Sequence, residues 1–419
     1  MLSAKTLKTA FWTIGVALVL AGSWAWIDRF VNADKNANYG SVVPWGLWVS
    51  VYIYFIGLSA GSFLVSSLVY VFRIQRFEPI GRLALYSAVV TLLLALLSIS
   101  ADLGHPFRAW HVFVYPNFRS PMAWMIWLYS AYFALLMLEL WFVLRHDLVR
   151  ASKGPGWKAK IYRVLVFGSR DESPETLASD RQIVRVLATI GVPLAIMFHG
   201  GVGALFGVVS ARPAWHGGLF PILFLVSALA SGGALLVLVS AVFQEGLRKN
   251  RDTVLALGSL VLVLLAIDLL LEISEILVGF YGNEPARVSN LRLIYGGPYW
   301  WVFWIWQLGL GTIVPIAILL LPQTKKNPAA VALACGMITV GFLALRLNIV
   351  IPGLADEQLA GLTEAISSDR VSTDYVPSVM EFLFSAGIVG IGLLLFGLGE
   401  WLLPRGQETS NEEVSHVSA

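Results

Sequence analysis

Residues 44–72 read PWGLWVSVYIYFIGLSAGSFLVSSLVYVF and contain no charged residue. A helix of about 20 apolar residues already crosses the roughly 30 Å hydrocarbon core of a bilayer. Comparable runs recur along the chain, at about 9–28, 79–101, 121–145, 182–206, 217–243, 253–280, 298–322, 329–352 and 378–403. The sequence therefore predicts an all-α polytopic membrane protein with about ten transmembrane helices.

The composition of the 419-residue chain agrees with this class. Hydrophobic residues make up 57% and charged residues only 13%, whereas soluble domains average roughly 25% charged residues. The single cysteine, Cys335, excludes an intrachain disulfide and any all-thiolate iron–sulfur or zinc site. Residues 9–28 follow Lys5 and Lys8 as a signal peptide would, but we expect a retained anchor. Membrane lipid, and no nucleic acid, is the expected environment.

Lysine and arginine are distributed unequally between the two sides. Of the 29, 20 fall at the two termini and in the connections on their side, 8 fall on the opposite side, and Arg346 lies within a segment. The positive-inside rule therefore places both termini in the cytoplasm. The connection 146–181 is the only one long enough for a small extramembrane element, and nothing in it resembles a separate domain. We expect one membrane domain, 1–419.

Segments 44–72 and 217–243 share a small-residue pattern at an offset of 171 residues. LSAGS (58–62) matches LASGG (229–233), and such residues would allow close helix contact, although small-residue clusters are common in membrane helices. The helices that follow both carry acids toward their outer ends. We expect two parallel four-helix bundles, 44–206 and 217–352, with peripheral helices at 9–28 and 378–403.

The segment 253–280 contains three acids, Asp268, Glu272 and Glu275. Steps of four and three residues keep them within about 60° of one another on a helix, so they form one polar stripe. Ionisable groups inside a membrane usually face a bundle interior or a cavity, and often mark a pathway or site.

Other polar residues show the same outward bias, namely Asp102, His105, His199, Arg346, Asn348 and Glu381. Together they predict a site in the outer half of the membrane. Simpler readings remain for single residues. Arg346 and the glutamates could form a structural ion pair, and His199 could be a hydrogen-bonded packing residue. His105 and Glu381 could lie in the headgroup zone. Aromatic side chains often form a belt at the membrane–water interface. We expect part of such a belt to be formed by tryptophans 45, 48, 300, 301, 304 and 306.

Glu139 is the exception, because it falls in the inner half of its segment. With Asp268 near the midplane, it could lead protons from the cytoplasm toward the outer site. A snorkelling or hydrogen-bonded Glu139 is the alternative.

A site with histidine, carboxylates and arginine in an apolar wall suits a lipid-soluble quinone. The two quinone carbonyls need hydrogen-bond donors, and each two-electron step moves two protons. The chain has no redox cofactor motif, and a bis-histidine haem pathway is poorly supported because most histidines cluster outside. We therefore expect no haem or iron–sulfur cluster in this chain, and electron exchange with another subunit.

Five motifs carry a family resemblance: PWGLWVSVYIYFIGLSAGSFL (44–64), ISADLGHPFRAW (99–110), MFHGG (197–201), RLNIVIPG (346–353) and YVPSVMEFLFSAG (375–387). They resemble the NrfD/PsrC family of respiratory membrane subunits over about residues 40–400. Ten segments resemble its longer branch, as in menaquinone reductase, hydrogenase-2-type and alternative complex III membrane subunits.

The resemblance implies a quinone-binding subunit in the inner membrane of a prokaryote, with menaquinone or ubiquinone as substrate. It also implies a ferredoxin-like iron–sulfur partner on the outer, periplasmic face and a molybdopterin-type or multihaem cytochrome subunit in the same complex. The placement of Glu139 and Asp268, apart from the resemblance, adds the expectation of proton conduction from the cytoplasm.

Asp102 lies within a family motif, and with His199 and Glu272, chosen by position, it makes the expected catalytic set. The expected quinone pocket adds Tyr52, Tyr54, His105, Glu275, Arg346, Asn348 and Glu381. The expected proton path uses Glu139 and Asp268, and no metal site is expected. The polysulfide-reductase type has a quinone-site histidine on the helix where this chain has Tyr52 and Tyr54.

Two rival functions remain. A secondary transporter would also explain a parallel repeat, but it predicts helices broken by Gly or Pro near the midplane. Pro193 and Pro315 form no matching pair in the two halves. A purely structural membrane anchor would not need the buried acids.

Overall fold

The computed structural model describes residues 4–404 apart from 244–246, 248–249, 358, 360, 367 and 369. All regular structure in this part is helical, and ten helices are long and apolar enough to cross a membrane, which confirms the predicted class. They are α1 (Ala4–Asn32), α2 (Leu47–Tyr70), α3 (Glu78–Asp102), α5 (Pro121–Ser152), α7 (Pro174–Gly207), α8 (Phe220–Val242), α9 (Arg251–Tyr281), η3 (Val302–Ile313) continued by α11 (Val314–Leu320), α12 (Pro328–Leu354) and α14 (Val379–Leu402). The side chains of Lys5 and Lys8 lie outside the described residues.

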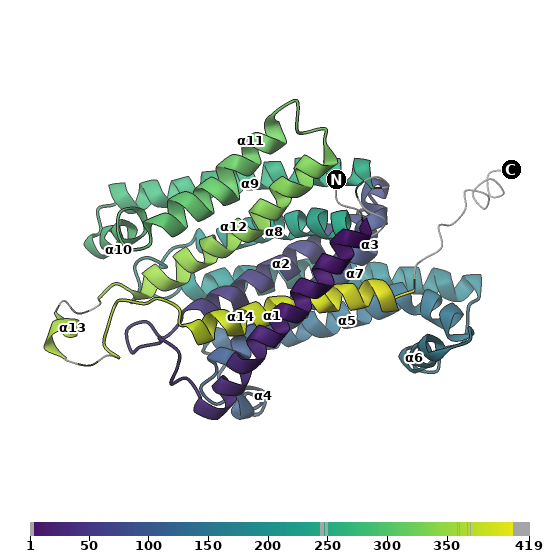
Figure 1. Cartoon of the computed structure of the whole chain (residues 1–419), viewed down its shortest axis with the longest axis horizontal. Coiled ribbons are helices and arrows are strands. Elements are labelled where there is room, and N and C mark those ends of the chain that lie inside the picture. Colours follow the sequence, from purple (N-terminus) through teal and green to yellow (C-terminus); the bar gives the residue numbers. More distant parts are fainter. Residues whose placement is uncertain are drawn as a thin grey trace.

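The long helices run side by side along the long axis of the molecule (Figure 1). Short helices occupy the two ends. At the end that we name the outer end, after the predicted orientation, lie η2 (Pro106–Arg108), α4 (His111–Val114), α10 (Pro285–Tyr295) and α13 (Leu362–Ala365). At the inner end lie η1 (Gln75–Phe77) and α6 (Trp157–Leu165). The prediction that only 146–181 could hold an extramembrane element is wrong, because α10 forms 11 residues of helix between two spans.

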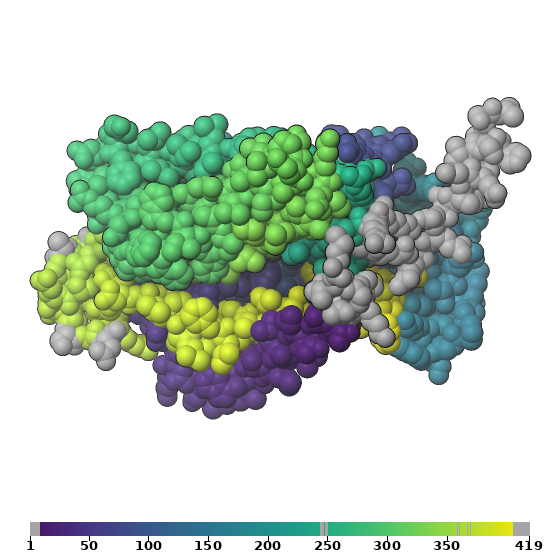
Figure 2. Space-filling view, turned by 45° about the horizontal axis from the view of Figure 1, so that its top comes forward, coloured from purple at the N-terminus to yellow at the C-terminus, as the bar shows by residue number. Residues whose placement is uncertain are grey.

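Helix contacts place α2 and α8 in the middle of the molecule. α2 packs against α3, α7, α8 and α12, while α5 packs against α3 and α7. α8 packs against α9 and α12, and α12 packs against η3 and α11. α1 lies beside α14 (purple and yellow in Figure 2), which in turn contacts α3. The helices of 44–206 also pack against those of 217–352, through α2, α7, α8 and α12, and their relation as a parallel repeat stays a prediction.

α2 and α8 touch through glycines. A Cβ atom on Gly61 would lie 1.9 Å from the carbonyl oxygen of Ala228, and one on Gly232 would lie 2.6 Å from the Cα of Gly61. The backbones can therefore approach this closely only without a side chain there, as in other close membrane-helix crossings. Gly61 and Gly232 are 171 residues apart, so positions equivalent in the proposed repeat meet each other, as they would across a two-fold axis.

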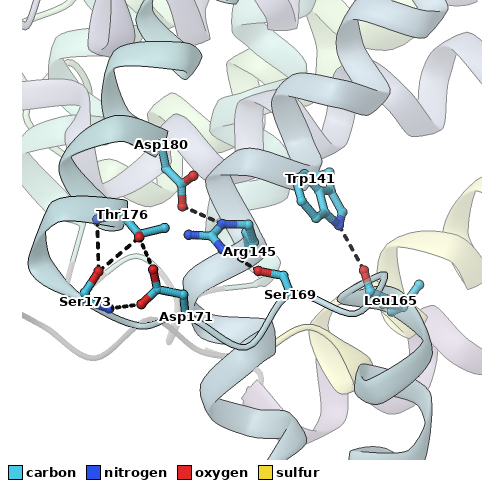
Figure 3. A network of polar contacts seen from close by, with 8 residues as sticks. All are labelled: Trp141, Arg145, Leu165, Ser169, Asp171, Ser173, Thr176 and Asp180. Carbon is cyan, nitrogen blue, oxygen red and sulfur yellow. Dashed lines mark hydrogen bonds and ion pairs between the residues drawn. The ribbon is translucent and has the colours of Figure 1, made fainter.

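A buried ion pair joins α5 and α7 near the inner end (Figure 3). The Nε of Arg145 lies 2.7 Å from Oδ2 of Asp180, and the two side chains are 6% and 8% exposed. Arg145 also donates a hydrogen bond to the Ser169 hydroxyl. The indole N–H of Trp141 donates to the Leu165 carbonyl at 2.9 Å. These bonds hold the connection between the two helices against their ends.

Candidate functional site

The expected site residues fall into two clusters. The outer cluster, where the outer ends of α1, α2, α3 and α14 meet, consists of Arg29, Tyr39, Trp48, Asp102, Tyr375 and Glu381. The central cluster, between α7, α8, α9, η3 and α12, consists of His199, Ser227, Asp268, Glu272, Gln307, Arg346 and Asn348. Gly57, which borders the central cluster, follows Trp48 by nine residues, or about 14 Å along α2. The single pocket expected for Asp102, His199 and Glu272 is therefore spread over two places.

Asp102 ends α3 and is half-buried. Its carboxylate makes no hydrogen bond within the described chain, although it interacts electrostatically with Arg29 and Glu381. Arg29 donates instead to two carbonyls at the end of α3, from Nε to Ala101 at 2.8 Å and from Nη2 to Leu103 at 2.9 Å. Arginine thus caps this helix C-terminus, and the Asp102 carboxylate stays available.

Two hydrogen-bond donors of the outer cluster also lack an acceptor among the described residues. The Tyr39 hydroxyl oxygen accepts from the Trp48 backbone N–H at 3.3 Å, and no bond uses its own hydrogen. Burial, helped by nearby Tyr375, Asp102 and Glu381, raises the pKa of Tyr39 well above its ordinary value, so the phenol stays protonated. The indole N–H of Trp48 is buried without a partner. Trp48 is only 1% exposed, so its assignment to an interfacial belt is wrong.

Glu381 is fully buried within the protein, so its side chain does not face lipid headgroups. Its carboxylate accepts from the backbone N–H groups of Asn38 at 3.1 Å and Ser378 at 2.8 Å, and from the Tyr375 hydroxyl. The Ser378 hydroxyl in turn accepts from the Glu381 N–H, which completes a capping box at the start of α14. The carboxylate is therefore occupied by bonds that hold the fold.

A chain of amides and an acid runs through the central cluster. Gln307 Nε2 donates to both carboxylate oxygens of Glu272 at 3.2 Å, and Asn348 Nδ2 donates to Gln307 Oε1 at 2.7 Å. Gln307 lies in η3, which is a π-helix. Such helices are rare and frequently occur at functional sites. Neither the π-helix nor Gln307 was predicted from the sequence, where the glycines at 309 and 311 are the only hint.

Three fully or nearly buried polar atoms of the central cluster have no hydrogen-bond partner in the described chain. They are Nη1 of Arg346, Oδ1 of Asp268 and Nδ1 of His199. Arg346 donates from Nη2 to the Ser227 hydroxyl, and its guanidinium carbon lies 4.5 Å from the centroid of the Phe224 ring. It interacts electrostatically with Asp268 and Glu272. A direct ion pair of Arg346 with a glutamate, one of the simpler readings, is not found among the described residues.

His199 behaves in part as a packing residue. Its Nε2 lies 2.7 Å from the Phe224 carbonyl oxygen, which fixes the ring and leaves Nδ1 unpartnered. A Cβ on Gly57 would lie 3.6 Å from Cε1 of His199 and 3.5 Å from Nη2 of Arg346, so both side chains approach α2 at this glycine. Within the described residues, no group of three or more His, Cys, Asp or Glu side chains is placed to hold a metal ion.

Two of the expected pocket residues lie toward the outer end, away from the central cluster. Glu275 forms an ion pair with Arg287 of α10, so it does not share the surroundings of Glu272 although it lies on the same stripe. His105 is exposed and precedes η2 in the loop after Asp102.

The two tyrosines on α2 point to different bundles. The Tyr54 hydroxyl donates to the Thr339 carbonyl of α12 at 2.8 Å. Tyr52 interacts electrostatically with Tyr129 of α5. Two positions along a helix differ in direction by about 200°, so Tyr52 and Tyr54 lie on nearly opposite faces of α2. A single ligand on one side of α2 therefore cannot contact both.

Glu139 of α5 is fully buried, and neither carboxylate oxygen has a hydrogen-bond partner in the described chain. The snorkelling reading is therefore wrong, and within the described chain no hydrogen bond to the carboxylate is found. The acid interacts electrostatically with Tyr132 and Tyr70. The Tyr132 hydroxyl points toward α2, where it donates to the Ser59 carbonyl at 3.4 Å.

Comparisons with known proteins agree with this architecture. The family model described as "Polysulphide reductase, NrfD" matches residues 35–356. The chain is 37% identical to a selenate reductase subunit of Mesobacillus selenatarsenatis, over 95% of this chain and 94% of that protein. It is 28% identical to an Hdr-like menaquinol oxidoreductase integral membrane subunit of Archaeoglobus fulgidus (95% and 93%). It is 25% identical to one of the polysulfide reductase chains of Wolinella succinogenes (76% and 98%). The chain therefore belongs to the NrfD family.

Proposed function

We propose that this chain is the quinone-reactive membrane subunit of a respiratory oxidoreductase complex in the inner membrane of a prokaryote. Electrons would pass between menaquinone or ubiquinone in the membrane and a ferredoxin-like iron–sulfur subunit on the outer face. The family and the relatives named after selenate reductase, polysulfide reductase and menaquinol oxidoreductase support this role.

The observation that carries the proposal is the outer cluster, where a carboxylate and two donors have no hydrogen-bond partner among the described residues. A quinone offers two carbonyl oxygens as acceptors, and its two-electron chemistry requires two protons. The Tyr39 hydroxyl and the Trp48 indole N–H are the donors that such a ring needs. Asp102 can exchange a proton with bulk water at the outer end, because it is only half-buried. The bound quinone supplies the redox chemistry, and these residues orient it and move the proton.

The loop after Asp102 fits an outer-face partner. Between 107 and 118 it exposes several large apolar side chains, namely Phe107, Trp110, Phe113, Tyr115 and Phe118. Exposed apolar patches of this kind mark protein or membrane contacts. Because the loop begins at Asp102, an iron–sulfur subunit bound there would lie next to the quinone. A molybdopterin-type or multihaem subunit would then complete the complex.

The buried acids suggest how protons could reach the outer cluster. Glu139 interacts with Tyr132, whose hydroxyl reaches α2 at Ser59. Two residues earlier on α2, Gly57 admits His199 and Arg346, and Arg346 interacts with Asp268. We propose that Glu139 and Asp268 conduct protons along this route from the inner end. Internal water is the ordinary partner of buried polar atoms that the protein leaves unpaired.

The test is Asp102→Asn in the assembled complex. The amide keeps the size of the side chain but cannot exchange a proton, so quinone-linked electron transfer should fall roughly 100-fold while assembly is normal. Tyr39→Phe should raise the quinone concentration needed for half-maximal rate. Asp34→Asn is the matched control, because Asp34 is an exposed acid of the same outer region. Wild-type turnover in both Asp102→Asn and Tyr39→Phe would overturn the assignment.

A further inference from the structure

The inner-end helix α6 carries an exposed face that the proposed function does not use. Ala159 and Tyr162 are buried against the rest of the molecule, whereas Trp157, Lys160 and Val164 are exposed. Spacings of three and four residues put the exposed set on one side of the helix. An apolar face that includes lysine, beside the ends of membrane-spanning helices, is typical of a helix lying in the headgroup region of a bilayer.

Bonds to α14 fix the depth of α6. Lys158 donates from Nζ to the Trp401 carbonyl at 2.6 Å and lies 4.4 Å from the centroid of the Trp401 ring. The Tyr162 hydroxyl donates to the Leu402 carbonyl, also at 2.6 Å. Trp157 packs on Trp401 with ring centroids 5.0 Å apart. These carbonyls belong to the last turn of α14, so α6 is held at the inner end of that helix (Figure 1).

Several cations around α6 have no partner in the part of the chain that the structure describes. Within the described chain, the exposed side chains of Arg150, Lys160 and Arg170 make no hydrogen bond or ion pair. Arg163 donates from Nε to the Ser152 carbonyl at 3.0 Å, and its two terminal nitrogens make no bond to another described residue. Lys160 and Arg163 lie one helical turn apart. Their charges are thus presented together at the inner end of the molecule.

We propose that the exposed face of α6 binds the phosphate headgroup of an anionic phospholipid in the cytoplasmic leaflet. Lys160 and Arg163 would hold the phosphate, and the acyl chains would lie against Trp157, Val164 and Phe167. Charge complementarity selects an anionic lipid over a zwitterionic one, and the exposed apolar side chains select a lipid over free phosphate. Val164 and Phe167 are 70% and 78% exposed, which leaves an apolar surface for acyl chains beside the cations.

The experiment uses the complex in nanodiscs that contain phosphatidylcholine and phosphatidylglycerol, with native mass spectrometry of the lipids retained on release. The wild type should retain phosphatidylglycerol in preference to phosphatidylcholine. Each juxtamembrane charge is worth about fivefold in affinity for an anionic surface. The double variant Lys160→Gln/Arg163→Gln should therefore bind phosphatidylglycerol roughly 25-fold more weakly, while Lys160→Arg/Arg163→Lys should retain it.

Arg119→Gln is the control, because Arg119 is an exposed arginine at the outer end. It should leave phosphatidylglycerol retention unchanged, as should added inorganic phosphate. Trp157→Ala should weaken retention without altering the preference between the two lipids. Equal retention by the wild type and the double Gln variant, an equal loss in Arg119→Gln, or displacement by inorganic phosphate would each overturn the proposal.

Discussion

A buried arginine accompanies a buried aspartate in two regions of this molecule, with different results. Near the inner end, Arg145 and Asp180 form a direct ion pair, and Ser169 adds a further hydrogen bond. In the central cluster, Arg346 and Asp268 interact only at longer range, and each keeps an atom without a partner. Arg145 also leaves one nitrogen unpartnered, but both of its other nitrogens are bonded.

The difference separates two uses of buried charge. Burying polar groups is costly unless hydrogen bonds or ion pairs compensate for the loss of water. The Arg145–Asp180 pair meets this requirement and joins two helices, as expected of a structural element. In the central cluster, hydrogen bonds compensate only some of the buried polar groups, although the region is otherwise well packed. This contrast is what the proposed proton route through Asp268 requires.

Breaking the structural pair should have the largest effect on stability. Arg145→Gln leaves Asp180 buried and unpaired, which should cost about 3–5 kcal/mol. Thermal denaturation and the yield of assembled complex would measure this loss, while turnover per assembled complex should stay at the wild-type level. Lys153→Gln is the control, because it breaks the exposed pair with Glu172, and it should change stability by less than about 1 kcal/mol. Similar stability of the two variants would remove the distinction.

Two glutamates one turn apart on α9 sharpen the comparison within a single helix. Glu272→Gln removes an exchangeable acid from the central cluster but can still bond Gln307, so assembly should be normal and quinone-linked turnover should fall roughly 100-fold. Glu275→Gln removes the partly exposed ion pair with Arg287 and should cost about 1 kcal/mol or less, with turnover kept. Steady-state rates and assembly yields would decide, and the opposite pattern would place Glu272 among the structural residues.

Glu139 should give the smallest change in rate. Glu139→Gln removes an acid that has no hydrogen-bond partner in the described chain, so stability should change little. Electron transfer should slow only moderately, but fewer protons should be moved per electron, because the route from the inner end is interrupted. Proton-to-electron ratios in proteoliposomes would measure this. Unchanged ratios would argue that Glu139 lies off the route.

The transmembrane architecture was predictable because long uncharged runs leave a chain few alternatives in a bilayer. The LSAGS and LASGG segments similarly predicted a close helix contact, which Gly61 and Gly232 make. The capping role of Glu381 was not predicted, although Ser378-Val-Met-Glu381 is the S-x-x-E signature of a capping box.

The division of the polar residues into two clusters was not predictable. Helical spacing shows which residues share a face, but the partner of that face depends on tertiary packing. Glu272 and Glu275 lie on one stripe, yet one bonds η3 and the other bonds α10. Tyr39 carries no sequence signal, because it lies in an irregular loop and reaches the outer cluster only through folding.

The most direct test compares two aspartates, Asp180→Asn and Asp268→Asn, by measuring assembly and quinone-linked turnover on the same preparations. Our account predicts that Asp180→Asn lowers the amount of assembled complex but preserves turnover per complex. It predicts that Asp268→Asn assembles at the wild-type level and loses proton-coupled turnover. If Asp268→Asn fails to assemble while Asp180→Asn loses turnover per complex, or if both variants behave alike, the distinction between structural and functional buried charge is contradicted.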